Sequence, residues 1–200
     1  VEGRGINSFA DLKGKRVSSG PPNSATELMA FRVLEAYGFN WDKDIKRERL
    51  DVGKSSEAIK DNKIDAYFWV GGLPTSAVTD LAATPGTKIK LIDHTESVDR
   101  MNKKYGQLYV PGTIPAKTYP GQEKDGQIAV VWNLLVARAD MPDQVAYTIL
   151  KTIFDKKQEL INVHKEAGSF DYKNQSNAAA AIPFHPGAIK YFAEHGIKLN

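Results

Sequence analysis

The sequence predicts an α/β fold in which short parallel strands alternate with helices. Apolar segments of strand length recur between longer segments whose apolar residues follow helical spacing. Glycines and prolines mark the changes from strand to helix, as at 20–22 and 71–74. Strands separated by helices of this length are joined by right-handed crossovers into a largely parallel sheet. We therefore expect a ligand to bind beyond the carboxyl ends of the strands.

Most of the expected alternation lies in the first half of the chain. The helix predicted at 24–37 is the best supported, because Ser24 is a favourable N-cap and Gly38 a favourable stop. The other predicted elements there are strands at 15–20, 46–52, 65–70, 88–93 and 109–113, and helices at 55–62, 74–83 and 95–105. A loop rich in proline, glycine and polar residues follows at 116–127.

The chain beyond residue 127 has a different pattern. The apolar segment 128–137 predicts a buried strand. Pro142, with acidic residues on both sides, is typical of a helix start, and apolar residues then recur at helical spacing to about His164. A last helix is expected at 186–195. We find no internal repeat in the sequence.

Composition narrows the class of protein. The 200 residues, 42% of them hydrophobic, can form a real core, and no apolar run has the length of a membrane span. The net charge of +3 is dispersed, so we expect no nucleic-acid partner. Cysteine is absent, which excludes disulfides and thiolate chemistry. Because the chain begins with Val1 and has no charged, apolar leader, we expect a processed product or an excised piece.

The segment 11–27, D-L-K-G-K-R-V-S-S-G-P-P-N-S-A-T-E, runs a strand through a short loop directly into a helix. The first turn of a helix has unpaired backbone amides and the positive end of the helix dipole, so it favours a carboxylate or phosphate. Ser24, Thr26 and the free amides would be the donors. The alternative is purely structural, because Ser24 and Glu27 have the spacing of a capping box.

A second junction of the same kind lies at 67–75, Y-F-W-V-G-G-L-P-T. Gly71 and Gly72 would let the backbone approach a ligand closely, and Trp69 could supply a flat apolar wall. Two such junctions could face one cleft. The alternative is that the glycines only make a turn and that Trp69 is core. The isolated aromatic residues are weaker candidates: Tyr109, Tyr119 and Trp132.

The sequence offers little for catalysis. Its four histidines are scattered and have no partner at metal-ligand spacing, so we expect no metal site. The nucleophile elbow, the P-loop and the dinucleotide-binding fingerprint are all missing, so we expect no cofactor and no enzymatic activity.

Four segments together resemble the TAXI family, the TRAP-associated extracytoplasmic solute receptors that deliver substrates to a membrane transporter. They span nearly the whole chain in family order. The segments are 11–27, given above; I-D-A-Y-F-W-V-G-G-L-P-T-S-A-V-T-D-L-A at 64–82; T-I-P-A-K-T-Y-P-G-Q at 113–122; and I-P-F-H-P-G-A at 182–188.

The resemblance implies a type II periplasmic-binding-protein fold, with two α/β lobes and a ligand in the cleft between them. Residues 1–8 would be a hinge-proximal segment, 9–126 lobe 2, and 127–200 the return into lobe 1. The sequence lacks the Gly-rich start of lobe 1, so the second lobe would be complete and the first partial. A partial lobe 1 would expose apolar surface, through which the chain is expected to self-associate.

The resemblance also implies a function outside the cytoplasmic membrane. The protein would hold a small anionic ligand, with glutamate or another acidic amino acid first and dicarboxylates next, and deliver it to TRAP membrane subunits. The ligand-binding residues implied are, for the carboxylate, Asn23, Ser24, Ala25 and Thr26; for the facing wall, Gly71, Gly72 and Thr75; and, with less support, Trp69 and Tyr119.

Two other classes of protein share this fold. The first is the effector-binding domain of a LysR-like transcriptional regulator, for which a DNA-binding helix-turn-helix encoded upstream would decide. The second is an enzyme built on the same two-lobe plan. An enzyme would need a perturbed acid, base or nucleophile in the cleft, and the sequence offers no convincing candidate.

Overall fold

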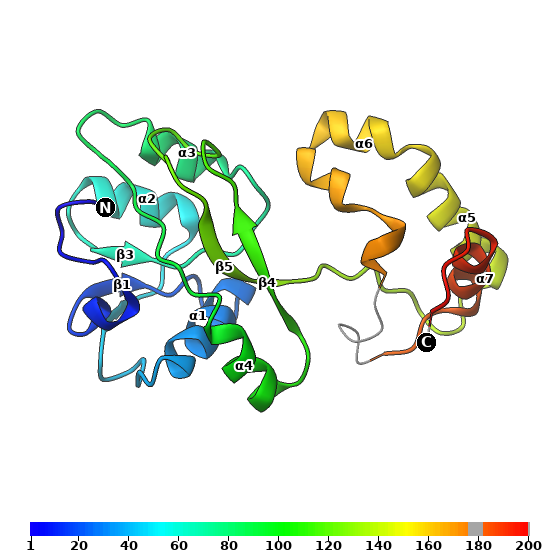
Figure 1. The fold of residues 1–200 in the computed structure, drawn as a ribbon, viewed down its shortest axis with the longest axis horizontal. Helices are drawn as coiled ribbons and strands as arrows, with labels where there is room; N and C mark the ends of the chain where they lie inside the picture. Colours follow the sequence, from blue (N-terminus) through cyan, green and yellow to red (C-terminus); the bar gives the residue numbers. More distant parts are fainter. Residues whose placement is uncertain (176–181, 200) are drawn as a thin grey trace. The chain divides into compact units, whose positions relative to one another are not determined.

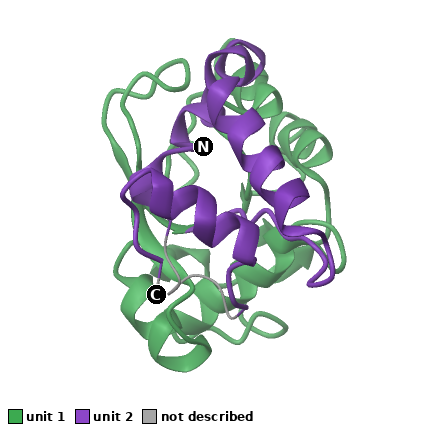
Figure 2. Ribbon diagram, turned by 90° about the vertical axis from the view of Figure 1, so that its right-hand side faces the viewer, with its two compact units in different colours: residues 1–130 green, residues 131–200 purple. Residues whose placement is uncertain are grey.

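The computed structural model of the protein describes residues 1–175 and 182–199. The chain divides into two compact units, Val1–Val130 and Val131–Asn200, which are coloured separately in Figure 2. Among the described residues, no helix is long and apolar enough to cross a membrane.

Unit 1 is the mixed α/β domain that the alternating pattern predicts (Figure 1). The order of its elements is η1 (Phe9–Leu12), β1 (Arg16–Ser18), α1 (Ala25–Ala36), β2 (Lys46–Glu48), α2 (Val52–Lys60), β3 (Ala66–Tyr67), α3 (Ser76–Ala82), α4 (Ser97–Tyr105), β4 (Tyr109–Ile114) and β5 (Gly126–Val131). Each predicted helix of this unit is present, and its bounds lie within a few residues of the prediction.

The central strand of the sheet is β1, which pairs in parallel with β2 on one side and with β3 on the other. Val17 lies opposite Arg47 in β2 and Ala66 in β3. The chain therefore passes from β1 to its neighbour β2 and then crosses over β1 to reach β3. With right-handed crossovers, this order places α1 and α2 on opposite faces. Figure 1 shows α1 with α4 on one side of the sheet and α2 with α3 on the other.

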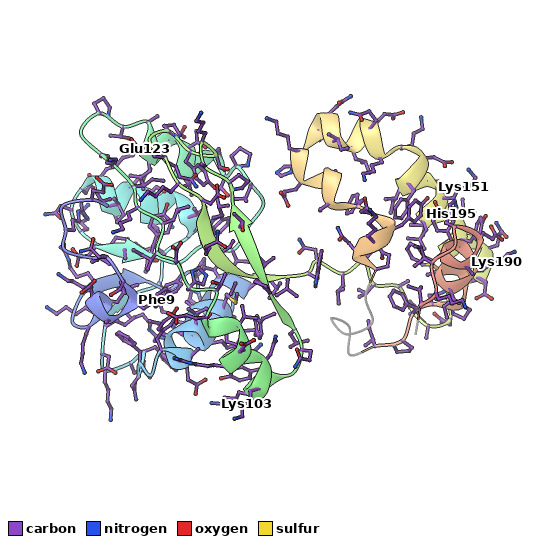
Figure 3. The ribbon with its side chains drawn as sticks, in the orientation of Figure 1. Phe9, Lys103, Glu123, Lys151, Lys190 and His195 are labelled. Carbon is purple, nitrogen blue, oxygen red and sulfur yellow. The ribbon has the colours of Figure 1, made fainter. Side chains whose placement is uncertain are left out.

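The core of unit 1 surrounds the sheet. Val17 and Leu34 are fully buried, and Ile59, Ile64 and Leu81 are nearly so. Phe9, labelled in Figure 3, stacks on Tyr37 at the end of α1 with ring centroids 4.3 Å apart. These contacts make one packed layer of helix on each face of the short sheet.

Two buried serines, at the end of β1 and directly after it, interrupt this apolar core. Ser18 and Ser19 are both fully buried. The Ser18 hydroxyl accepts hydrogen bonds from the Ser55 hydroxyl of α2 at 2.9 Å and from the Leu50 amide at 3.3 Å. Because buried hydroxyls need partners, these bonds fix the start of α2 against the end of β1.

The predicted strand at 88–93 is wrong, because no strand lies there in the described structure. Lys88, at its start, and His94, directly after its end, make isolated backbone hydrogen bonds rather than a ladder. Lys88 O accepts from Glu2 N at 2.8 Å, and His94 N donates to Gln127 O at 2.8 Å. The remaining strands, β4 and β5, form a separate two-stranded sheet.

The predicted buried strand at 128–137 is also wrong in its second half. Strand β5 ends at Val131, and the side chains that follow are exposed. Leu135 is 71% exposed and Val136 is 63% exposed. Apolar composition alone gave the prediction, and it cannot tell a covered strand from an uncovered segment.

Unit 2 is helical in the part of the chain that the structure describes. Its elements are α5 (Asp143–Asp155), α6 (Lys157–Val163), η2 (Lys165–Ser169), η3 (Tyr172–Asn174) and α7 (Pro186–Glu194). The helix start near Pro142 and the last helix are confirmed. The single long helix expected to about His164 is instead broken at Lys156, whose backbone leaves the helical region.

The core of unit 2 is an aromatic cluster between α5, η3 and α7. Phe154 stacks on Tyr172 with ring centroids 4.4 Å apart, and Tyr172 stacks on His195, which Figure 3 labels at the end of α7. Helices α5 and α7 approach closely at Gly187, where a Cβ atom would lie 2.1 Å from Asp143 O. Only glycine permits this approach of two backbones.

Unit 2 carries most of the large apolar side chains that are exposed among the described residues. They are Trp132, Leu134, Leu135, Val136, Val145, Ile149, Val163, Phe170, Ile182 and Ile189. Singly exposed apolar residues are ordinary, but a concentration of them in one small unit is not. The division into two lobes stays a prediction.

Candidate functional site

The candidate site lies at the carboxyl end of the sheet, between β1 and β3. The loop after β1 leads to α1 on one face of the sheet, and the loop after β3 leads to α3 on the other. In open α/β sheets, two neighbouring strands whose connections leave to opposite faces create a crevice at their carboxyl ends, where ligands bind. Both junctions singled out in the sequence lie at this point.

A hydrogen bond joins the two junctions directly. Val70 N, in the loop after β3, donates to Thr26 Oγ1 in the first turn of α1 at 3.3 Å. Thr26 is 4% exposed, so this contact is inside the protein rather than on its surface. The structure therefore brings together segments that lie far apart in the sequence.

The start of α1 has the cap that the sequence predicts. Ser24 Oγ accepts from Glu27 N at 3.1 Å and donates to Pro21 O at 2.7 Å. The Glu27 carboxylate reaches back one residue further than in a standard capping box and accepts from Asn23 N at 2.8 Å. The Ser24 hydroxyl is thus occupied by the protein itself, so the structural alternative is right for that side chain.

The cap leaves two amides of the same turn free. Within the described parts of the chain, neither Ala25 N nor Thr26 N has a hydrogen-bond acceptor. Free amides in the first turn are the groups with which a helix binds an anion. The loop before them depends on Gly20, whose φ is +94° and whose added Cβ would lie 2.6 Å from Thr26 Cγ2.

The second junction is held by a small hydrogen-bond network around Thr75. Trp69 Nε1 donates to Thr75 Oγ1 at 2.8 Å, and Thr75 Oγ1 donates to Gly72 O at 2.8 Å. Tyr119 OH accepts from Thr75 N at 3.2 Å. The Thr75 hydroxyl is therefore used to close the loop, and it fixes the Trp69 ring.

Trp69 and the two glycines form the accessible part of this junction. The indole is 38% exposed and lies against the Gly71 backbone, where an added Cβ would be 2.5 Å from Trp69 Cζ2. In the described structure the amides of Gly71 and Gly72 have no acceptor, and both residues are exposed. Gly71 is thus required by the packing of Trp69, and not only by the turn.

The residues expected at the site fall into two groups. Asn23, Ala25, Gly71, Gly72 and Trp69 are exposed and could touch a ligand. The others support them: Thr26 and Tyr119 are buried, and Ser24 and Thr75 are half-buried. Of the weaker candidates, Tyr109 is buried against Arg32, and Trp132 belongs to unit 2.

Arg49 was missed by the sequence analysis. It directly follows β2 at the same edge of the sheet, and its guanidinium binds the Glu27 carboxylate, with Nε 2.8 Å from Oε1. Burial raises the pKa of Glu27, but the hydrogen bonds from Arg49 and from the Asn23 amide outweigh burial, so the pKa of Glu27 is lowered. Arg49 lies inside the strand predicted at 46–52, so its position in the sequence gave no sign of a role at the site.

The chemistry of this arrangement favours binding over catalysis. The groups free to meet a ligand are backbone amides and an indole ring, and the nearby Glu27 is paired and ionised at neutral pH. Among residues 1–175 and 182–199, no cluster of histidine and acidic residues could hold a metal ion.

The comparison with known families agrees with this assignment. The sequence model of the NMT1-like family matches residues 1–196, which is nearly the whole chain. The chain belongs to the NMT1-like family. This is a periplasmic-binding-protein-like family, whose members are in general extracytoplasmic solute-binding proteins without enzymatic activity.

Membership of the NMT1-like family confirms the general class expected from the sequence, namely a small-molecule-binding protein of the periplasmic-binding type. The narrower assignment to TAXI receptors stays a prediction.

Two hollows lie away from the candidate site. One of about 370 Å³, lined by Gly38, Phe39 and Trp41, is at the opposite end of α1, and one of about 320 Å³ lies along α5 and α6.

Proposed function

We propose that this NMT1-like protein is the solute receptor of a TRAP-type transporter of the TAXI family, and that it binds a small carboxylate at the end of the sheet. The observation that carries the proposal is the hydrogen bond from Val70 N to Thr26 Oγ1. It joins two loops that follow the paired ends of β1 and β3, and in the described structure each loop has amides without an acceptor. Such a crevice is where open α/β sheets bind ligands.

Backbone amides at a helix start suit the capture and release of an anion. The amides of Ala25 and Thr26 point with the positive end of the α1 dipole, and those of Gly71 and Gly72 come from the facing loop. They stabilise a carboxylate without transferring a proton to it or forming a covalent bond. The ligand would therefore leave chemically unchanged when the site opens.

The proposed ligand is glutamate or a related acidic amino acid, with dicarboxylates next. One carboxylate of the ligand would accept hydrogen bonds from the backbone amides. The exposed indole of Trp69 would lie beside the rest of the ligand. The proposed place of action is outside the cytoplasmic membrane, where the receptor presents its ligand to TRAP membrane subunits. This agrees with the usual location of the family.

The binding proposal is tested by calorimetric titration of the whole chain with glutamate and with succinate. We expect Thr26→Val to weaken binding, because valine keeps the shape of threonine but cannot accept the Val70 amide. Thr84→Val is the matched control, since the Thr84 hydroxyl donates within its own turn of chain, to Asp80 O at 2.8 Å, and does not join two loops. Equal affinity of the wild type and Thr26→Val would remove this site from consideration.

The carrier proposal is tested by recovering the ligand after incubation with the protein and identifying it by mass spectrometry. An unchanged ligand supports a receptor. Steady conversion to a product, abolished by a single substitution at the site, would overturn the proposal.

We further propose that the chain associates with copies of itself through the apolar side chains of unit 2. Leu135, Val136 and Ile149 are among the exposed residues that would be covered. Size-exclusion chromatography with light scattering should show dimers or larger species, and Leu135→Lys should reduce them. A monomeric wild type would contradict this proposal and leave the binding proposal untouched.

A further inference from the structure

An ion pair links strand β2 to the first turn of α1. The Arg49 guanidinium contacts both oxygens of the Glu27 carboxylate, with Nε 2.8 Å from Oε1 and Nη2 3.3 Å from Oε2. The Glu27 side chain is 7% exposed, whereas that of Arg49 is 43% exposed. A carboxylate this deeply buried depends on a partner, because an unpaired buried charge is strongly unfavourable.

Glu27 connects Arg49 to the loop before α1 by hydrogen bonds. Its Oε2 also accepts from Asn23 N at 2.8 Å. Asn23 has a φ of +60°, a left-handed conformation that asparagine adopts more readily than most residues with a side chain. The chain of contacts from Arg49 through Glu27 to Asn23 therefore holds the turn directly before the cap of α1.

Glu27 also creates an electrostatic difficulty at the candidate site. Its carboxylate lies in the same helical turn as the free amides of Ala25 and Thr26. A negative charge there repels an incoming carboxylate, and it offsets the favourable helix dipole. The Arg49 guanidinium cancels that charge. Arg47 contributes in the same direction, because its positive charge also lowers the pKa of Glu27.

We propose that Arg49 is a positioning residue of the carboxylate site. It neutralises Glu27 and, through Glu27, fixes the loop that precedes α1, without contacting the ligand itself. The inference rests on the proposed function, because it assigns Arg49 a role at that same site. It explains why a cation lies at this edge of the sheet while no free cationic side chain is needed to bind the anion.

Three variants separate charge compensation from direct contact, with glutamate and succinate as probes. Arg49→Met should weaken binding by about tenfold or more, because it leaves the Glu27 charge uncompensated beside the anion. Arg49→Lys should lose less, because it keeps the charge but not the two-point geometry. The pair Glu27→Gln with Arg49→Met should recover most of the affinity, since the uncompensated charge is gone and glutamine can still accept the Asn23 amide.

The double variant decides between the two roles. If it binds as weakly as Arg49→Met, the guanidinium contacts the ligand directly and the proposal is overturned. Unchanged binding by Arg49→Met would also overturn it. The control is Lys104→Met, which breaks the ion pair of Lys104 with Glu35 near the other end of α1 and should leave affinity unchanged.

A second measurement needs no ligand. Hydrogen exchange of the Asn23 amide should be faster by about tenfold or more in Arg49→Met than in the wild type, and protection should return in the double variant. Unchanged exchange at Asn23 would overturn the positioning role. If the wild type binds neither probe, the proposed function fails for these ligands, while the exchange data still decide the role of Arg49.

Discussion

Replacing Gly20 with alanine should destabilise unit 1 and disturb the start of α1 at the same time. Gly20 has a φ of +94°, and an added Cβ would lie 2.6 Å from Thr26 Cγ2, 2.7 Å from Thr26 Cβ and 3.2 Å from Glu27 N. Two separate costs follow. The left-handed conformation costs alanine about 1–2 kcal/mol, and forcing a methyl group into packed atoms costs about 1–3 kcal/mol.

The net loss is smaller than the sum of these costs. Alanine also lowers the conformational entropy of the unfolded chain, which stabilises the folded state by about 0.4–1 kcal/mol. We therefore expect Gly20→Ala to lower the free energy of unfolding of unit 1 by about 1–4.6 kcal/mol. The contact atoms belong to a β-branched side chain and to a helix backbone, so the neighbours cannot move away easily.

Gly38→Ala is the matched control, because it lies at the other end of the same helix. Its φ is +81°, but no atom lies within 4 Å of an added Cβ. This variant carries the conformational cost alone, about 1 kcal/mol after the unfolded-state gain. The difference between the two variants therefore measures the contact with Thr26.

Native-state hydrogen exchange in increasing urea provides the assay. The amides of Val17 and Val33 report the global opening of unit 1, because both residues are buried, at 0% and 1% exposure. Equal destabilisation by Gly20→Ala and Gly38→Ala would refute the reasoning, since it would mean that the loop relaxes away from Thr26 without cost.

Three further outcomes are expected. Ser24→Ala should lower the stability of the protein by about 1 kcal/mol in thermal denaturation, because the Glu27 amide loses its acceptor. Since the pKa of Glu27 in the folded protein is below its ordinary value of 4.5, its ion pair stabilises the fold above that pH, and this contribution should be lost as the pH falls through the lowered pKa. Urea denaturation between pH 7 and pH 3 should therefore show that the free energy of unfolding falls with pH, and that it falls less in Glu27→Gln than in the wild type. An equal fall in the two proteins would contradict the contribution of the ion pair. Gly187→Ala should destabilise unit 2 by about 1–3 kcal/mol or more, because the new methyl group would meet Asp143 O at 2.1 Å, and circular dichroism on heating should show it.

Local signals in the sequence predicted the ends of α1 well. Ser24, Glu27 and Gly38 begin or end α1 through contacts with residues close to them in the sequence. Their roles can therefore be predicted without knowing the rest of the fold. The parallel orientation of β1, β2 and β3 was also predicted, because helices separate them, whereas the central position of β1 was not. The adjacency of the two Gly-containing junctions follows from that central position.

What depends on tertiary contacts could not be predicted. The segment 88–93 has a strand-like composition but lacks a neighbouring strand along its length, so no ladder forms. The break at Lys156 has neither glycine nor proline beside it, so no strong helix breaker in the sequence marks it. At the site, Arg49 became visible only when Glu27 was seen to be buried beside it. An arginine in a charged segment such as 46–49 would ordinarily be taken as a surface residue.

The central position of β1 has a consequence for the order in which the protein folds. Both of its neighbours come later in the sequence. The sheet is therefore complete only after Val17 has paired with Arg47 and with Ala66. Such non-local pairings slow folding, because a long loop must close before any contact repays its entropy. During synthesis one edge of β1 stays open until β2 has emerged and the other until β3 has emerged, and open strand edges of this kind are where a nascent chain pairs wrongly with other chains.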